Sequence, residues 1–279
     1  MRHAQVSSPR ATLASLALFA LTLLTISCGP GRITLPTGSG TPFPDATAAY
    51  TEAVGSCKGV QTLSASLSLS GRAGSTKLSA RIDAGFAAPS RLRLEGYPRI
   101  AFGGRAFFVL VANGADATLV LTRDNRVLRG APASAIIEAL TGVALTPDEM
   151  RAVIAGCAFG AGEPTDGRTF DRGWASVQIG STTAFLRRTD NQWRVGGARR
   201  GSLLVEYSDF AGTRPMTVRL HTLSSAGVVP ADLSIRISQL EMNATLENNV
   251  FTVDVPKDAA PLTIEELRRA GPLGEAKGE

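Results

Sequence analysis

The chain has 279 residues, of which 44% are apolar and 19% are charged, so it can bury a core and is not disordered along its whole length. Its two His and three Cys exclude a histidine-rich metal centre, a four-thiolate zinc site and a small disulfide framework. The formal net charge is +5 without any block of Lys and Arg, which excludes the electrostatic footprint of a nucleic-acid binder. We therefore expect no metal, no cofactor and no nucleic-acid partner.

The N-terminus carries the pattern of an export signal. After a short basic stretch, residues 11–26 are apolar apart from Thr and Ser, and this run is shorter than the roughly 20 residues of a membrane-spanning helix. It matches the apolar core of a signal peptide. Ser27 and Cys28 follow, as in a bacterial lipobox, although Thr25 stands where Leu is usual. The sequence therefore predicts a lipoprotein signal peptide over 1–27 and a lipidated Cys28, with an ordinary secretory signal as the alternative.

The sequence predicts that the protein is located in the cell envelope. Gly29 rather than Asp follows the cysteine, which favours anchoring in the inner leaflet of the outer membrane, facing the periplasm, over the inner membrane. An exported chain folds in an oxidising compartment, and two cysteines remain after lipidation of Cys28. We expect Cys57 and Cys157 to form a disulfide, which for a loop of about 100 residues stabilises by roughly 4 to 5 kcal/mol in the chain-entropy model. Two free buried thiols are the alternative.

The first elements after the signal peptide are a tether and a short helix. Residues 28–44 are rich in Gly, Pro, Ser and Thr, a composition typical of a flexible tether. Asp45 is a candidate N-cap for a helix over 46–58. We expect the folded domain to cover 45–262, followed by a C-terminal helix and polar tail over 263–279.

Alternating apolar and polar residues predict antiparallel strands in two groups. Leu and Ser alternate over 63–70, and similar period-2 patterns recur between turn signals such as Asn113-Gly114. The strand over 106–112 is apolar on both faces. The predicted strands of the first group are 63–70, 78–84, 91–95, 106–112, 117–122 and 126–129. Those of the second group are 174–179, 183–188, 193–198, 203–210, 216–221, 233–240 and 250–255.

A helical period separates the two groups. Two short helices are predicted over 132–140 and 147–155, each beginning at Pro, with Thr146 as the N-cap of the second. The segment 160–172 is predicted as a polar loop. Because no helix lies between successive strands, a parallel α/β sheet is excluded, and we expect one strongly curved antiparallel sheet. The two helices have to bury their apolar side, and the concave face of that sheet offers the place.

Several of these features resemble the LolA/LolB superfamily of bacterial lipoprotein carriers and receptors. They are the lipobox cysteine, the Leu-Ser strand after a short helix, the Leu-Arg-Leu-Glu-Gly run at 92–96, the Phe/Val strand closed by Asn-Gly, and above all the stretch 136–157. The resemblance covers roughly residues 45–260. It implies a mainly β fold with a few helices, namely a half-open antiparallel β-barrel covered by a short helical lid.

The resemblance also implies a function. A protein of this kind takes up acyl chains in a hydrophobic cavity as a carrier or receptor for outer-membrane localisation. The implied partners are lipoprotein acyl chains or other lipids, the membrane through the lipid anchor, and a periplasmic carrier protein, with the chain itself a monomer. In the receptors an apolar residue of the loop after the third strand helps to hand cargo to the membrane. Ile100 and Phe102 occupy that loop here, and packing of Phe102 back on the sheet is the alternative.

The candidate binding positions are the apolar residues expected on the concave face of the sheet and on the lid. For the cavity they are Leu67, Leu69, Leu78, Ile82, Leu92, Leu94, Phe107, Val109, Val111, Leu119 and Leu121. For the lid they are Ile136, Ile137, Leu140, Met150 and Ile154. At each position ordinary core packing is the alternative, because alternation does not distinguish a dry core from an open cavity.

Catalysis has little support in the sequence. There is no Gly-X-Ser-X-Gly elbow, and the acidic pair Asp148-Glu149 stands at the start of a predicted helix, where it complements the helix dipole. We therefore expect the protein not to be an enzyme, although an unrecognised site stays open. The alternative to lipid binding is a non-catalytic envelope scaffold or assembly lipoprotein that uses the same fold for protein partners. An apolar cavity favours the first function, and a filled barrel with an exposed apolar patch or sheet edge favours the second.

Overall fold

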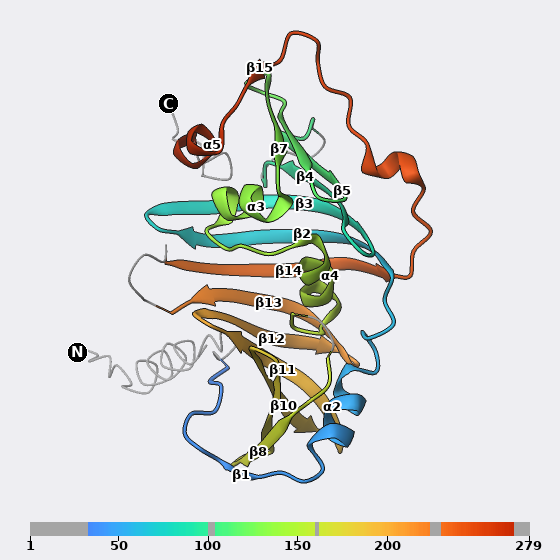
Figure 1. Ribbon diagram of the computed structural model, residues 1–279, viewed down its shortest axis with the longest axis vertical. Helices are drawn as coiled ribbons and strands as arrows, with labels where there is room; N and C mark the ends of the chain where they lie inside the picture. Colours follow the sequence, from blue (N-terminus) through green and yellow to red (C-terminus); the bar gives the residue numbers. More distant parts are fainter. Residues whose placement is uncertain (1–32, 100–103, 160–161, 224–229, 271–279) are drawn as a thin grey trace, which may run out of the picture. The chain divides into compact units, whose positions relative to one another are not determined.

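The computed structural model describes residues 33–99, 104–159, 162–223 and 230–270. In this part of the chain fifteen strands form one continuous sheet (Figure 1). In chain order the strands are β1 (Thr41–Pro42), β2 (Thr62–Ala73), β3 (Thr76–Ala87), β4 (Arg91–Tyr97), β5 (Phe108–Asn113), β6 (Ala117–Leu121), β7 (Arg126–Ala131), β8 (Asp166–Phe170), β9 (Trp174–Ile179), β10 (Thr182–Thr189), β11 (Gln192–Arg200), β12 (Leu203–Ala211), β13 (Arg214–Thr222), β14 (Ala231–Met242) and β15 (Ala260–Pro261).

The two groups of strands join in the middle of the sheet. The spatial order is β1-β8-β9-β10-β11-β12-β13-β14-β2-β3-β4-β5-β6-β7-β15. At the junction β14 pairs with β2 from Ala231 opposite Ala73 to Met242 opposite Leu63. Neighbouring strands are antiparallel except β7 and β15, which are parallel. Strands β7 and β8 follow each other in the sequence, yet they lie near opposite edges of the sheet.

Both edges of the sheet end in a two-residue strand that contains proline. On one edge Thr41 and Pro42 of β1 pair with β8, and on the other Ala260 and Pro261 of β15 pair with β7. Proline has no N–H to donate to a further strand. Short edge strands with proline therefore oppose pairing between the sheets of two molecules.

Helices cover one face of the sheet. They are α2 (Ala46–Val54), α3 (Ala133–Thr141), α4 (Pro147–Ala155) and α5 (Ile264–Ala270). The 3₁₀ helix η1 (Asn248–Phe251) lies on the opposite face. Helix α2 packs on β8 to β11, α4 on β2, β3, β4 and β13, and α3 on β6 and α5. In Figure 1, α3 and α4 lie in front of the middle of the sheet. The predicted fold is confirmed: a mainly β protein in which a large, curved, open antiparallel sheet carries a short helical lid.

The period-2 pattern decides which face of the sheet the helices cover. Along β2 the residues Leu63, Ala65, Leu67 and Leu69 are buried, while the serines between them are partly exposed. The buried side chains join one core cluster with the apolar residues of α2, α3 and α4. Antiparallel sheets of this kind keep one face on the core and one in water.

The start of α4 follows the predicted capping. The Thr146 hydroxyl accepts a hydrogen bond from the Glu149 backbone N–H at 3.2 Å, and the Glu149 carboxylate accepts one from the Thr146 N–H at 2.9 Å. Such a reciprocal cap is worth about 1 kcal/mol. Gly156 ends the helix with a φ of 94°, a left-handed value that glycine adopts without strain.

The predicted disulfide between Cys57 and Cys157 is present, with the two Cα atoms 5.6 Å apart. Cys57 follows α2 and Cys157 follows α4. Because α2 packs on β8 to β11, the bond ties the C-terminal end of α4 to that half of the sheet.

Three expectations, for the tether, the first helix and the loop over 160–172, need correction. Leu35 is buried and β1 pairs with β8, so the C-terminal part of the segment 28–44, expected to be a flexible tether, is packed. The helix expected over 46–58 ends at Val54. Strand β8 lies inside the segment 160–172 that was expected to be a loop; with Gly167 as its buried position, it has no apolar alternation to reveal it.

The strand expected over 250–255 is wrong. Residues Asn248–Phe251 form η1, which lies against β4 and β5. Phe251 is 2% exposed and packs with Ala87 and Val111 in a cluster separate from the main core. The apolar residues of this segment therefore cover the face of the sheet opposite the lid and do not extend the sheet.

We expect Phe251→Ala to lower the free energy of unfolding by about 3 kcal/mol, because it leaves a cavity against Ala87 and Val111. Denaturant unfolding measures this change. Asn249→Ala is the matched control, since Asn249 is exposed on the same turn and its loss should stay within about 0.5 kcal/mol. Equal effects of the two substitutions would contradict the covering role of Phe251.

Candidate functional site

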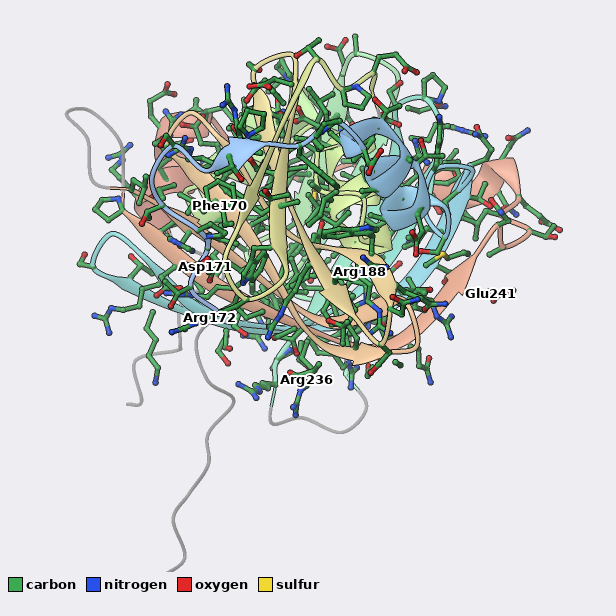
Figure 2. The ribbon with its side chains drawn as sticks, turned by 90° about the horizontal axis from the view of Figure 1, so that it is seen from below. Phe170, Asp171, Arg172, Arg188, Arg236 and Glu241 are labelled. Carbon is green, nitrogen blue, oxygen red and sulfur yellow. A yellow bond between two sulfur atoms is a disulfide. The ribbon has the colours of Figure 1, made fainter. Side chains whose placement is uncertain are left out.

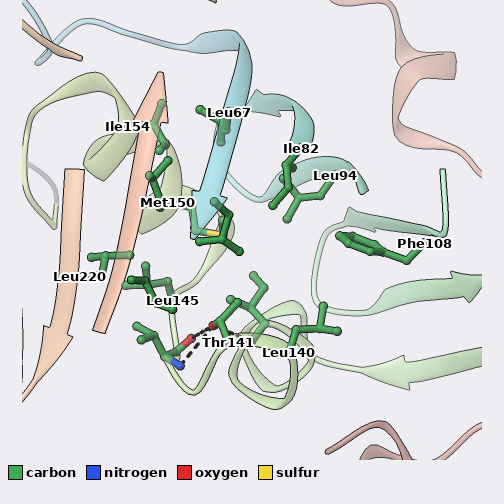
Figure 3. A pocket seen from close by; sticks show the side chains of 15 residues that line it. Leu67, Ile82, Leu94, Phe108, Leu140, Thr141, Leu145, Met150, Ile154 and Leu220 are labelled. Atoms are coloured by element: carbon green, nitrogen blue, oxygen red, sulfur yellow. Dashed lines mark hydrogen bonds between the residues drawn. The ribbon is translucent and has the colours of Figure 1, made fainter. Parts of the chain in front are cut away.

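An apolar cavity of about 60 Å³ lies between the middle of the sheet and the lid (Figure 3). Strands β2, β3, β4, β5, β13 and β14 form its floor, and α3, α4 and their connection form its roof. The lining residues are Leu67, Leu69, Ile82, Leu94, Phe108, Ile137, Leu140, Thr141, Val143, Leu145, Met150, Ile154, Leu220, Leu233 and Ile235.

The one polar side chain among these lining residues is already occupied. The Thr141 hydroxyl donates to the Ile137 carbonyl at 2.7 Å and accepts from the Val143 N–H at 3.2 Å, as the dashed lines in Figure 3 show. It therefore completes the end of α3. The lining as a whole offers apolar contact and dispersion, which suits hydrocarbon and provides no group for acid–base chemistry.

About half of the predicted positions meet at this cavity. Four of the eleven predicted cavity residues line it, namely Leu67, Leu69, Ile82 and Leu94. Four of the five predicted lid residues line it as well, namely Ile137, Leu140, Met150 and Ile154. The remaining buried positions belong to the same core without reaching the cavity, and they are Leu78, Leu92, Phe107, Leu119, Leu121 and Ile136.

Val109 and Val111 do not face the cavity. They lie in the cluster with Phe251 on the opposite face of β5, and Phe108 lines the cavity instead. Strand β5 is apolar on both faces because η1 covers its outer side. Alternation of apolar and polar residues therefore does not show which residues of β5 point toward the cavity. A one-residue error in this choice moves every side chain of the strand to the other face.

Other lining residues were missed because they come from the second group of strands. Leu220 of β13 and Leu233 and Ile235 of β14 reach the cavity because β14 pairs with β2 in the middle of the sheet. Their own strands alternate in the sequence, which was the available signal. Ile100 and Phe102 of the predicted handover loop, like Cys28, lie outside the described residues.

Helix α4 is fastened to the rest of the fold by polar contacts at its N-terminal half. The Arg200 guanidinium on β11 donates to the Glu149 carboxylate, and Arg151 donates to the Val60 carbonyl. The side chains of Arg200 and Glu149 are 28% and 22% exposed, so their ion pair is partly screened from water. These contacts join the lid to β11 and to the segment after α2.

The C-terminal end of α4 is held in the buried core. The Tyr207 hydroxyl donates to the Val153 carbonyl at 3.0 Å and accepts from the Ala158 N–H at 2.9 Å. Burial raises the pKa of Tyr207, so the phenol stays protonated and keeps donating. Together with the Cys57–Cys157 disulfide, these bonds fix this end of the helix.

Helix α3 is attached mainly through the C-terminal helix. It packs against α5, whose Leu267 is buried in the core. The ion pair between Glu138 and Arg268 is 3.8 Å long, and both side chains are about half exposed. Helix α5 is in turn held by the 2.7 Å contact between Arg126 and Glu266. Exposed ion pairs contribute little to stability, so α3 is less firmly fixed than α4.

The Glu149 carboxylate makes the lid contacts dependent on pH. Burial raises the pKa of Glu149, but hydrogen bonds from Arg200 and Thr146 and the charge of Arg200 together lower it below its ordinary value of 4.5. A carboxylate with a lowered folded-state pKa contributes stability that is complete above its unfolded pKa. That contribution is lost as the pH falls through the lower folded-state value.

Comparisons with known proteins bear on the fold. No family model and no curated protein sequence matches this chain. It is similar to the solved structure of a LolA superfamily protein from Nitrosomonas europaea, with a TM-score of 0.50 and 11% identity over 75% of this chain and 97% of that chain. The solved structure of a lipoprotein-sorting protein domain from Vibrio parahaemolyticus is similar over 74% of this chain and 96% of that chain, with 10% identity and a TM-score of 0.43. The likeness to the first structure confirms the fold that the sequence resemblance predicted.

None of the helices in the described residues is both long and apolar enough to cross a membrane. None of the groups of His, Cys, Asp and Glu in this part of the chain is arranged to hold a metal ion.

We expect Glu149→Gln to lower the free energy of unfolding by about 1 kcal/mol at pH 7, because it removes the charge that Arg200 faces. The difference from the parent protein should shrink as the pH falls through the lowered folded-state pKa of Glu149, because below it the carboxyl is protonated in both states. Urea unfolding at several pH values measures it. Glu138→Gln is the control, because its ion pair is longer and half exposed. A Glu149→Gln deficit that does not change with pH would contradict this assignment.

Proposed function

We propose that the protein takes up acyl chains of lipoproteins or other lipids between the curved sheet and the lid. It acts as a carrier or receptor for outer-membrane localisation, anchored through Cys28 in the leaflet that faces the periplasm. The observation that carries the proposal is the cavity beneath α3 and α4, whose lining is apolar apart from one occupied hydroxyl. The similarity of its fold to that of a LolA superfamily protein supports it.

Binding of an acyl chain requires the lid to move. The cavity of about 60 Å³ is smaller than the roughly 150 Å³ apolar cavity that takes up benzene in an engineered protein. In the closed state the side chains of Ile137, Leu140 and Met150 occupy the space over the sheet. An entering acyl chain replaces their contacts with its own. Because each buried methylene contributes about 0.8 kcal/mol, ten methylenes supply roughly 8 kcal/mol toward opening the lid.

The attachments of the lid indicate which part moves. The C-terminal end of α4 is fixed by the Cys57–Cys157 disulfide and by Tyr207. Helix α3 depends on α5 and on an exposed ion pair. We therefore expect α3 and the connection around Gly142 to swing away while the end of α4 stays in place. Direction of transfer then needs only a difference in affinity between this protein, its donor and the membrane.

The scaffold function has less support. It calls for an exposed apolar patch or an open sheet edge. Among the described residues Leu223, at 45% exposure, is the exposed large apolar side chain, and each sheet edge ends in a strand with proline.

The test is uptake of a fluorescent fatty acyl probe by the chain from residue 28 carrying Cys28→Ser. We expect Met150→Glu to weaken uptake by about tenfold or more, because a bound acyl chain would have to desolvate the new carboxylate. Met150 lines the cavity and is only partly buried, so the fold should survive the substitution. Circular dichroism and the unfolding midpoint check this.

Ala144→Glu is the matched control. It adds the same charge to the lid at an exposed position of the connection between α3 and α4, and uptake should stay within about twofold of the parent protein. Absence of probe uptake by the parent protein, or an equal loss in both variants, would overturn the proposal.

A further inference from the structure

The N-terminal segment lies on the outer face of the sheet, opposite the lid. Leu35, Trp174 and Phe185 are buried but do not belong to the main core cluster beneath the helices. A Cβ added to Gly197 of β11 would lie 2.9 Å from a Leu35 methyl carbon, so Leu35 rests directly on this strand. Phe185 of β10 is the register partner of Gly197. Leu35 therefore docks on an aromatic-lined part of the outer face.

Three exposed arginines share this outer face. Arg187 is paired with Trp174 and stacks on its ring at 5.5 Å, and Arg199 lies two residues beyond Gly197 on the same side of β11. Arg236 of β14 points away from the helices, toward the bottom of Figure 2. The neighbouring residues on each strand, such as Leu186 and Ala198, are buried in the core, which fixes the alternation. The arginines thus present their charge to solvent around the place where Leu35 docks.

Their charge is not neutralised locally. Within the described residues no carboxylate forms an ion pair with Arg187, Arg199 or Arg236. The nearby outer-face carboxylates of Glu206 and Asp232 are both taken by Arg219, at 3.0 and 2.7 Å. Unpaired guanidinium groups on an exposed face attract phosphate, to which they bind in a bidentate manner.

The length of the tether limits how far the outer face can lie from the membrane. Leu35 lies seven residues after Cys28, and a fully extended chain spans at most about 3.5 Å per residue. A lipid on Cys28 would therefore hold Leu35 within about 25 Å of the bilayer surface. This step rests on the proposed lipidation. Because Leu35 lies on the outer face, the anchor would join the domain on the side of the sheet opposite the lid.

We propose that Arg187, Arg199 and Arg236 bind the anionic phospholipid headgroups of the membrane that holds the anchor. The arginine surface and the short tether then orient the protein with its outer face on the bilayer and its lid toward the periplasm. Juxtamembrane Lys and Arg each strengthen binding to anionic bilayers by about fivefold. Three such contacts add orientation to an anchor that by itself leaves the domain free to rotate.

The experiment measures co-sedimentation with vesicles of phosphatidylethanolamine and phosphatidylglycerol at 3:1, using the chain from residue 28 with Cys28→Ser so that no acyl anchor contributes. We expect binding that falls with added salt and that is absent with phosphatidylcholine vesicles. The triple variant Arg187→Gln, Arg199→Gln, Arg236→Gln should bind about 20-fold more weakly or worse.

The matched control removes the same amount of charge elsewhere. Arg123, Arg129 and Lys257 are exposed near the opposite edge of the sheet, around β6, β7 and β15, and their triple replacement by Gln should change vesicle binding less than about twofold. Equal losses in the two triple variants, no binding by the parent chain, or equal binding to phosphatidylcholine would overturn the inference.

Acyl-probe uptake by the same proteins separates this inference from the proposed function. Loss of vesicle binding in the arginine variant with uptake retained supports the orienting surface as a distinct site. Arginine-dependent vesicle binding by a chain that takes up no probe leaves this surface standing while the proposed carrier function fails.

Discussion

The placement of β7 and β8 near opposite edges of one sheet is the constraint on which the rest of the structure depends. These strands follow each other in the chain, so the segment between them has to cross the whole sheet. Its backbone groups need internal partners during that crossing, and two short helices satisfy them. The concave face of the sheet is apolar and has to be covered. The crossing segment covers it as α3 and α4, so the presence of the lid follows from the order of the strands.

The crossing segment is held unequally along its length. At its far end α4 meets the disulfide, the buried Tyr207 hydroxyl and the Arg200 ion pair. At its near end α3 rests on α5, which belongs to the C-terminal segment and reaches the lid only after η1 and β15. A removed buried bond costs the full desolvation of its partner, whereas an exposed ion pair costs little. We therefore expect local opening to begin at α3, above the part of the cavity that Ile137 and Leu140 line.

The sequence was sufficient wherever local chemistry decides the structure. The Leu-Ser alternation of β2 fixed its buried face, Thr146 and Glu149 fixed the start of α4, and compartment and cysteine number pointed to the disulfide. Prediction from the sequence failed where contact with a distant segment decides which side chains face the cavity. The inward set of β5 depends on η1 covering its outer face, and the roles of Leu220 and Leu233 depend on the pairing of β14 with β2. Neither contact can be recognised from the hydrophobic periodicity of the strand that it affects.

The same sheet keeps two surfaces of opposite chemistry apart, and the N-terminal segment links them. From Leu35 on the outer face the chain passes through β1 at the sheet edge to α2 on the inner face, and then to Cys57. The disulfide carries the connection on to the fixed end of α4. An anchor at Cys28 would therefore pull on the part of the lid that stays in place, while α3 has no covalent link to this path except through α4. Under the two proposals made above, a protein held in this way would rest on a bilayer through its arginines without forcing the lid open. Opening would then be left to the acyl chain that competes for the apolar space.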